Sequence, residues 1–315
     1  MSTYRQLKGY NIKSISSDPA NAQIGQVWYN DTLNKIKVRT QVTAAWASGG
    51  SLGTARYGLQ GDGTQTAAFV AGGYPDLDQT EEYNGSSWSS GGDMGSNRYT
   101  FGANGTLTAG LAMGGYDPGT ATSTVNAEEY NGTAWAEQNN IPAATSQVTS
   151  VGTQGAALMF GGTADLDEAN EYDGTSWTEG GDMNTGRYGL AGAGTQAAAL
   201  AVGGNTDPAN LANVEEYNGT AWTEVNDIPA VRINFSGAGT QPAGIVFGGS
   251  PGTGVVTLLY DGTNWATTSN LATSRTQHGS AGTAAAALCI GGKSITAATE
   301  EFTEIAANTQ SLDVS

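Results

Sequence analysis

Short apolar runs that end in a Gly-Gly pair recur along the chain, as in the segments AAFVAGG and AGIVFGG. A short apolar run bounded by glycine is typical of a buried β-strand. Six such pairs follow one another at spacings of 42 to 47 residues: Gly72-Gly73, Gly114-Gly115, Gly161-Gly162, Gly203-Gly204, Gly248-Gly249 and Gly291-Gly292. A regular period in this range indicates a repeat architecture with one supersecondary unit in each repeat.

A second motif, Tyr-(Asn/Asp)-Gly-x-x-Trp, follows each of the first five pairs. It occurs at Tyr83…Trp88, Tyr130…Trp135, Tyr172…Trp177, Tyr217…Trp222 and Tyr260…Trp265. An Asn-Gly or Asp-Gly dipeptide between two extended segments favours a type I′ turn. The motif therefore predicts a third strand that ends at the tyrosine and a fourth strand that carries the tryptophan.

Fixed intervals join these motifs. An arginine follows the tryptophan by 10 residues and precedes the next Gly-Gly pair by 16, at Arg56, Arg98, Arg187, Arg232 and Arg275, with Thr145 in its place in the third repeat. We place the start of a first strand near this position, with a Gly-Thr turn such as Gly63-Thr64 after it. Only the segment between Gly-Gly and Tyr varies, from 11 to 16 residues. Each repeat is thus predicted to be a four-stranded antiparallel sheet with one variable loop, between its second and third strands.

The two ends of the repeat array complement each other. The sixth repeat has Phe302 where the tyrosine would stand and no tryptophan after it, whereas Trp46 precedes every complete repeat. We predict an all-β, six-bladed β-propeller over residues 39–302 whose last blade is closed by the strand around Trp46. This closure leaves no open edge strand. An open β-solenoid is the alternative, and it would not need that strand. Residues 1–38 are assigned to an N-terminal attachment segment with a β-hairpin, and residues 303–315 to a C-terminal tail.

The succession of apolar strand, Gly-Gly, Tyr and Trp resembles the Kelch repeat. The resemblance covers the predicted propeller and is specific for fold, not for function. The Tyr-to-Trp interval and the Asn-Gly turn are more similar to Kelch-like repeats in proteins of marine bacteriophages than to animal Kelch domains. The leader segment 24–38 also resembles a short hairpin that is common in phage tail-fibre and virion proteins. These resemblances imply a virion protein.

Charge is unevenly distributed along the chain. The net charge is −17, yet residues 1–40 carry six basic and two acidic side chains. The acidic remainder repels phosphate backbones, so we expect no nucleic-acid partner. No apolar run is long enough to span a membrane, and the N-terminus lacks the apolar region of a secretory signal. We therefore expect no membrane insertion and a protein made in the host cytoplasm and located in the virion.

Catalytic chemistry has little support in the sequence. The single histidine, His278, and the single cysteine, Cys289, are each read as structural, the latter as a small buried hydrophobe. We expect no enzyme and no cofactor. Pairs of acids with one residue between them, Asp76 and Asp78 or Asp165 and Asp167, could bind Ca²⁺. The full calcium-loop pattern is absent, so a solvated acidic loop is favoured.

The repeated arginines have two interpretations. They could ring one mouth of the central channel and bind an anion. The favoured interpretation is a structural one, in which they bond to carbonyls of a neighbouring blade or to the repeated pairs Glu81-Glu82 and Glu215-Glu216. The blade-to-blade role explains their regular spacing.

The predicted function is that of a non-enzymatic virion structural or binding protein: a fibre, spike or decoration component within an oligomeric assembly. Recognition usually lies in variable loops on a rigid scaffold. We therefore expect these loops to contact a host-surface glycan or protein through Tyr74, Asp76, Asp78, Tyr116, Asp117, Asp165, Asp167 and Asp207. Attachment to other virion proteins is assigned to Trp28, Tyr29, Lys35 and Lys37. An intracellular Kelch-type interaction scaffold and a glycan-active enzyme are the alternatives.

Overall fold

The computed structural model describes residues 4–7, 10–17, 19, 26–40, 44–75, 77–293, 296–304 and 308–312. These residues form strands, turns and irregular segments. They contain no helix that could cross a membrane. The chain divides into two compact units, residues 1–45 with 304–315, and residues 46–303. The predicted N-terminal boundary, after residue 38, falls seven residues before the observed one, whereas the predicted boundary after residue 302 differs by one residue. The C-terminal residues belong with the N-terminal segment.

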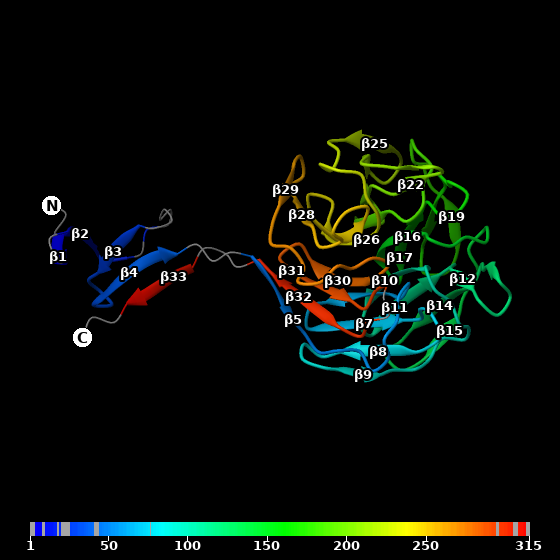
Figure 1. Ribbon diagram of the computed structural model, residues 1–315, viewed down its shortest axis with the longest axis horizontal. Helices are drawn as coiled ribbons and strands as arrows, with labels where there is room; N and C mark the ends of the chain where they lie inside the picture. The colour runs from blue at the N-terminus through cyan, green and yellow to red at the C-terminus, as the bar shows by residue number, and fades with distance from the viewer. Residues whose placement is uncertain are drawn as a thin grey trace. The chain divides into compact units, whose positions relative to one another are not determined.

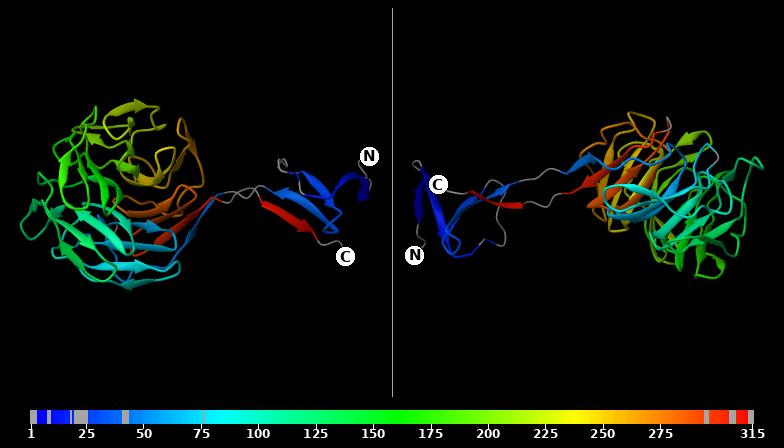
Figure 2. Two further views of the ribbon diagram at one scale, coloured as in Figure 1. Left: turned by 180° about the vertical axis from the view of Figure 1, so that it is seen from behind. Right: turned by 90° about the horizontal axis from the view of Figure 1, so that it is seen from below.

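The smaller unit is a five-stranded sheet of order β1-β2-β3-β4-β33. Its strands are β1 (Tyr4–Leu7), β2 (Tyr10–Ile15), β3 (Val27–Asn30), β4 (Lys35–Thr40) and β33 (Asn308–Leu312). The predicted hairpin is present, since β3 and β4 pair antiparallel with Tyr29 opposite Ile36. The C-terminal strand β33 lies alongside β4 (Figure 2). Residues 303–315 are therefore not a separate tail, because part of this segment completes a sheet.

The larger unit contains six four-stranded antiparallel sheets among its described residues. The first three are β6 (Gln60–Thr64), β7 (Ala67–Ala71), β8 (Thr80–Tyr83) and β9 (Trp88–Ser90); β10 (Gly102–Thr106), β11 (Ala109–Met113), β14 (Ala127–Tyr130) and β15 (Trp135–Glu137); and β16 (Thr149–Thr153), β17 (Ala156–Phe160), β18 (Ala169–Tyr172) and β19 (Trp177–Glu179). The last three are β20 (Ala191–Thr195), β21 (Ala198–Val202), β24 (Val214–Tyr217) and β25 (Trp222–Val225); β26 (Ile233–Thr240), β27 (Ala243–Ser250), β28 (Thr257–Tyr260) and β29 (Trp265–Thr267); and β30 (Gly279–Thr283), β31 (Ala286–Ile290), β32 (Thr299–Thr303) and β5 (Ala45–Ser48).

The sheets have a propeller-like arrangement. The first strands of successive sheets contact one another, and β30 of the sixth sheet contacts β6 of the first. Figure 1 shows β10, β16, β26 and β30 towards the middle, with β9, β15, β19, β25 and β29 towards the rim. The variable loops of the second and fourth sheets each form a small hairpin whose strands are two residues long. The first hairpin pairs β12 (Tyr116–Asp117) with β13 (Thr122–Ser123), and the second pairs β22 (Asn205–Thr206) with β23 (Ala209–Asn210).

Two predicted turns differ in detail from the structure. The Gly63-Thr64 pair ends β6, and the turn itself is made by the next two residues. The third and fourth strands are joined by four residues and not by a two-residue type I′ turn, since Tyr83 pairs directly with Trp88. Here the Asn84 carboxamide oxygen accepts the N–H groups of residues 86 and 87 at 3.0 Å each. This Asx-type turn satisfies the loop backbone through the side chain.

Buried aromatic residues and glutamates join neighbouring sheets. The hydroxyl of Tyr130 donates to Glu82 of the preceding sheet at 2.5 Å, and Tyr172 donates to Glu129 at 3.0 Å. Equivalent bonds join Tyr217 to Glu171, Tyr260 to Glu216 and Tyr83 to Glu301. The motif tyrosines are almost completely buried. They belong to the core between repeats, whereas the tryptophans are mostly half-buried.

Candidate binding site at the mouth of the central cavity

A closed ring of backbone hydrogen bonds joins the six repeats at or just before the start of their first strands. Each member lies two residues after the repeat arginine or its replacement, and the N–H of each donates to the carbonyl of the equivalent residue in the preceding repeat. We call these residues the mouth ring: Gly58, Thr100, Gln147, Gly189, Asn234 and Gln277. The six N–O distances are 2.7 to 3.2 Å, and the last bond, from Gly58 N–H to Gln277, returns to the first repeat.

The mouth ring lines a central cavity of about 130 Å³. All six members have positive φ, from 50° to 66°. Glycine takes this conformation without strain, whereas other residues lose roughly 1–2 kcal/mol each. Thr100 is a β-branched residue at φ 52°, which is an uncommon combination. Four of the six positions thus carry polar side chains in a backbone conformation that disfavours them.

One carboxyl group lies deeper in the cavity wall. Asp62 on β6 accepts the N–H of Gly63 at 2.7 Å and, across to the second sheet, the N–H of Gly105 at 2.9 Å. Burial raises the pKa of Asp62 to about 7, although these two hydrogen bonds favour its ionised form. Hydrolysis of a glycosidic bond by paired carboxyl groups needs two of them. Asp62 is the single acidic side chain among the described lining residues.

Four tyrosines extend from the mouth ring across the first two repeats. We call Tyr57, Tyr74, Tyr99 and Tyr116 the tyrosine ladder, because successive ring centroids are 4.9, 5.9 and 5.2 Å apart. Tyr57 and Tyr99 directly precede members of the mouth ring. Backbone bridges pair Tyr57 with Tyr74 and Tyr99 with Tyr116.

The ladder is accessible to solvent. Tyr74 is 39% exposed, and the other three are half-buried. Partial burial raises the pKa values of Tyr57 and Tyr99, and the neighbouring ladder hydroxyls raise them further. Aromatic rings that carry hydroxyl groups can pack against an apolar surface and form hydrogen bonds at the same time.

The residues predicted from the variable loops are only partly brought together. Tyr74 and Tyr116 are linked through Tyr99 within the ladder. Asp165 accepts the backbone N–H of Asp207 at 3.3 Å, which joins the third and fourth repeats.

The other predicted acids show no shared centre. Asp117 accepts the N–H groups of residues 119 and 120 within its own turn. Asp78 is half-buried and Asp167 is exposed, while Asp76 lies outside the described residues. The part of the chain that the structure describes holds no group of three or more metal-ligating side chains.

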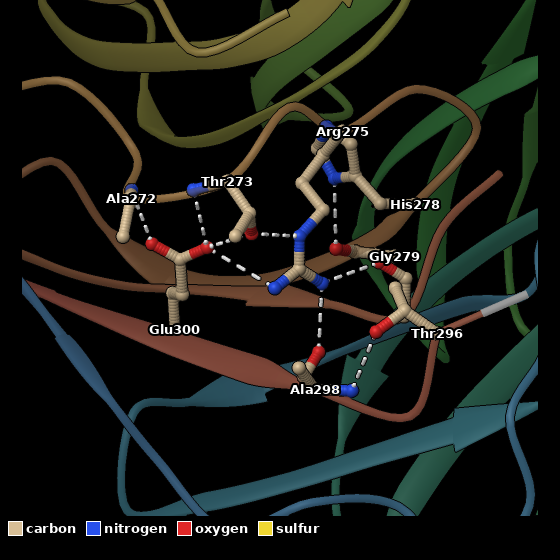
Figure 3. Close-up of polar contacts among 9 residues, drawn as sticks. Ala272, Thr273, Arg275, His278, Gly279, Thr296, Ala298 and Glu300 are labelled. Atoms are coloured by element: carbon tan, nitrogen blue, oxygen red, sulfur yellow. Dashed lines mark hydrogen bonds and ion pairs between the residues drawn. The ribbon is translucent and has the colours of Figure 1, made fainter. Parts of the chain in front are cut away.

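The repeated arginines pair with the predicted glutamates, as in Arg56–Glu81 and Arg187–Glu215, but they do so within their own repeat and not across to a neighbouring one. Each of Arg56, Arg98, Arg187 and Arg275 is buried and pairs with a glutamate of its own sheet, at 3.0, 2.6, 3.0 and 3.1 Å. Figure 3 shows the last pair, in which Arg275 also donates to Ala298 and Glu300 accepts the N–H groups of Ala272 and Thr273. The connection between repeats comes instead from the backbone, for example Gly73 N–H to Arg98 C=O at 2.9 Å.

Two repeats depart from this pairing in a correlated way. The third has Thr145 for the arginine and Asn170 for the glutamate, so both charges are absent. The fifth keeps Arg232, but Leu258 replaces the glutamate. Arg232 donates to the carbonyl of Gly248, and burial lowers its pKa. Among the described residues it has no carboxylate partner.

His278 and Cys289 are both fully buried, which agrees with the structural roles predicted for them. The two ring nitrogens of His278 lie 3.2 Å from the carbonyl oxygens of Gly279 and Phe247, and the ring stacks on the Phe247 ring at 5.3 Å. Burial lowers the pKa of His278 to about 4. Burial also raises the pKa of the Cys289 thiol far above its usual range, so this thiol stays protonated.

The four predicted attachment residues lie in the smaller unit and differ in how far their side chains are exposed to solvent. Trp28 and Tyr29 are 1% and 6% exposed, and Tyr29 belongs to a core cluster with Ile12 and Ile36. These aromatic side chains stabilise the unit itself and do not offer a surface. Lys35 is exposed and Lys37 is half-buried.

The sequence did not predict the mouth ring, and it predicted only Tyr74 and Tyr116 of the four ladder tyrosines. A local signal exists for both. The residue after the repeat arginine is tyrosine in the first, second and fourth repeats, at Tyr57, Tyr99 and Tyr188. The next residue is always glycine or an uncharged polar residue. The predicted strand start at the arginine holds for the fifth repeat, where both positions belong to β26, whereas in the other five repeats they precede the first strand.

No protein-family model matches this chain, and no curated protein matches it. Its structure is similar to the solved structure of YjhT, with a TM-score of 0.66 at 13% sequence identity over 81% of this chain and 95% of that one. At this level of identity the similarity concerns the fold alone.

Proposed function

We propose that this chain is a non-enzymatic protein of a bacteriophage particle, a fibre, spike or decoration component, that binds a host-surface glycan through the tyrosine ladder. The repeat style and the leader hairpin support the phage assignment. The ladder supports the glycan, and it is the observation that carries the proposal.

The finer architecture that we propose is a six-bladed Kelch-like propeller whose last blade is closed by the N-terminal strand β5. Each sheet is then one blade. The pairing of β5 with β32 and the returning hydrogen-bond ring support this arrangement. A closed scaffold of this kind holds loops and turns at one end in fixed positions, which suits a binding surface.

The chemistry of the ladder fits a sugar chain. A pyranose presents an apolar face of C–H groups and a rim of hydroxyls. Tyrosine offers a flat apolar ring and a hydroxyl at a small cost in conformational entropy, which is why it is common in binding surfaces. The ladder brings four such rings together, with centroid spacings of 4.9 to 5.9 Å between neighbours. Four neighbouring rings offer packing area for more than one sugar unit, which favours an oligosaccharide over a single sugar.

The ladder can be tested by paired substitutions. Tyr74→Ala with Tyr116→Ala should reduce binding of the labelled protein to host cells and to a glycan array by ten-fold or more. The matched control is Glu179→Ala, an exposed change on β19. Binding that survives the tyrosine substitutions would contradict the role of the ladder.

The smaller unit is proposed to attach the protein to other virion proteins. It has its own sheet and core, and exposed Lys35 lies on it. Mass spectrometry of purified particles tests the assignment directly, because a virion component must be present in them. Particles assembled with a chain that lacks residues 1–43 and 305–315 should then contain less of the protein. An unchanged amount would exclude attachment through this unit.

A further inference from the structure

We infer that the mouth ring seats an uncharged, hydroxyl-rich end group, namely the terminal unit of a neutral saccharide whose next units lie along the tyrosine ladder. This inference rests on the proposed glycan-binding function and names the substrate class of the same site. It depends on three properties of the mouth ring: its backbone conformation, its free hydrogen-bonding groups and its charge.

The backbone conformation shows that the side chains of the mouth ring are not needed for the fold. Gly58 and Gly189 fill the same place in the ring as the other four members, with φ of 66° and 61° and the same backbone bonds. Glycine would relieve strain at every position. Thr100, Gln147, Asn234 and Gln277 are therefore kept at the mouth against the conformational preference of the backbone. Strain of this kind is concentrated at binding and active sites.

The amide groups of the mouth ring are available to a ligand. The side chains of Gln147, Asn234 and Gln277 line the cavity and are half-buried. None of them forms a side-chain hydrogen bond with another residue in the described part of the chain, whereas the Thr100 hydroxyl donates to the carbonyl of Tyr99 at 2.8 Å. Each carboxamide offers two donors and one acceptor oxygen. Three of them around one cavity can pair with hydroxyl groups, which are also both donors and acceptors.

The charge of the lining selects against an anion. The described lining residues include Asp62 and no lysine or arginine. A carboxylate, sulfate or phosphate group bound there would lose its hydration without gaining a counter-charge, and Asp62 would repel it whenever ionised. A neutral sugar incurs neither cost. The two tyrosines that directly precede Gly58 and Thr100 then continue the site outwards from the mouth.

Glycine substitutions separate binding from folding. In the full chain, Gln147→Gly combined with Gln277→Gly should raise Tm by about 2–4 °C per substitution, because strain is removed. The same variant should weaken binding at least ten-fold. Binding is read from an array of neutral and anionic oligosaccharides, followed by calorimetric titration of the best neutral binder. A matched control is Ala164→Gly, at φ 72° in an exposed turn of the third repeat, which should raise Tm and leave binding unchanged.

A second variant keeps the strain and removes only the amide. Gln277→Met has a similar length and keeps a side chain at the same φ but carries no amide and no charge, so it should weaken binding several-fold without raising Tm. If glycans bind and depend on the ladder tyrosines but not on the amides, or if the bound glycans are anionic, this inference is wrong while the proposed function stands. If no oligosaccharide binds, both are wrong. A Tm that does not rise in the glycine variant overturns the argument from strain.

Discussion

The indole N–H of Trp46 donates a 3.0 Å hydrogen bond to the hydroxyl of Thr257, although 211 residues separate them. The same bond joins Trp88 to Thr299 and Trp135 to Thr80 at other sheets. The Trp46 ring also packs against Phe302 at 5.2 Å, as each motif tryptophan packs against its motif tyrosine. Strand β5 thus makes the contacts of a fourth strand in the sixth sheet.

This relationship predicts the effect of truncation. A chain that begins at residue 44 and ends at 304 keeps β5. It should unfold cooperatively at nearly the same midpoint temperature as the larger unit does within the full chain. A chain that begins at residue 50 lacks Trp46 and should lose roughly 3–5 kcal/mol, the usual cost of deleting a large packed aromatic side chain. Thermal unfolding followed by circular dichroism measures both. Equal midpoints for the two truncations would show that β5 does not stabilise the sixth sheet.

The arginines offer a matched pair of substitutions. Arg187→Met leaves Glu215, which is 1% exposed, without its counter-charge and should cost roughly 3–5 kcal/mol. Arg232→Met leaves no carboxylate behind and should change stability by no more than about 1 kcal/mol. Urea unfolding of both variants gives the difference. A loss as large for Arg232 as for Arg187 would mean that the guanidinium acts through its backbone bond and not through the ion pair.

The seam between the fifth and sixth sheets lacks the usual Tyr–Glu bond on both sides, since Leu259 and Phe302 occupy the two positions. Phe302→Tyr should cost roughly 1–3 kcal/mol because its hydroxyl has no acceptor. Adding Leu259→Glu should recover most of that loss. A double-mutant cycle with both single variants measures the coupling. Additive effects would show that these positions do not face each other.

The pH dependence of stability includes a contribution from His278. Its pKa is lowered from 6.5 to about 4 on folding, so the unfolded chain binds the proton more readily. The contribution is therefore fully present above pH 6.5 and is lost as the pH falls towards 4. NMR titration should give a pKa near 4, and assignment is simple because the chain has one histidine. His278→Leu should flatten the stability profile between pH 6.5 and 4, whereas an unchanged profile would exclude His278 as its source.

The repeat spacing was enough to predict the sheets, because the contacts that form each sheet join residues that are close together in the sequence. Apolar runs, Gly-Gly pairs and the Tyr…Trp interval each specify contacts within one repeat or with the next, so they recur at fixed positions. The same regularity identified Trp46 as the missing strand of the sixth repeat. The arginine positions were equally visible. The prediction of the repeated glutamates as partners is confirmed, but the residue pattern does not show whether Arg98 pairs with Glu128 of its own repeat or with a neighbouring repeat.

Other features depended on contacts between distant segments. The ladder exists because the backbone pairs Tyr57 with Tyr74 and sets Tyr99 beside them. The assignment of residues 308–312 to the smaller unit likewise follows from pairing with β4. By itself, the sequence determined the repeat, its strands and its core, because these follow from short-range periodicity. The tertiary structure alone decided which polar and aromatic side chains meet at the cavity mouth, because that depends on how six turns from separate repeats are brought to one axis.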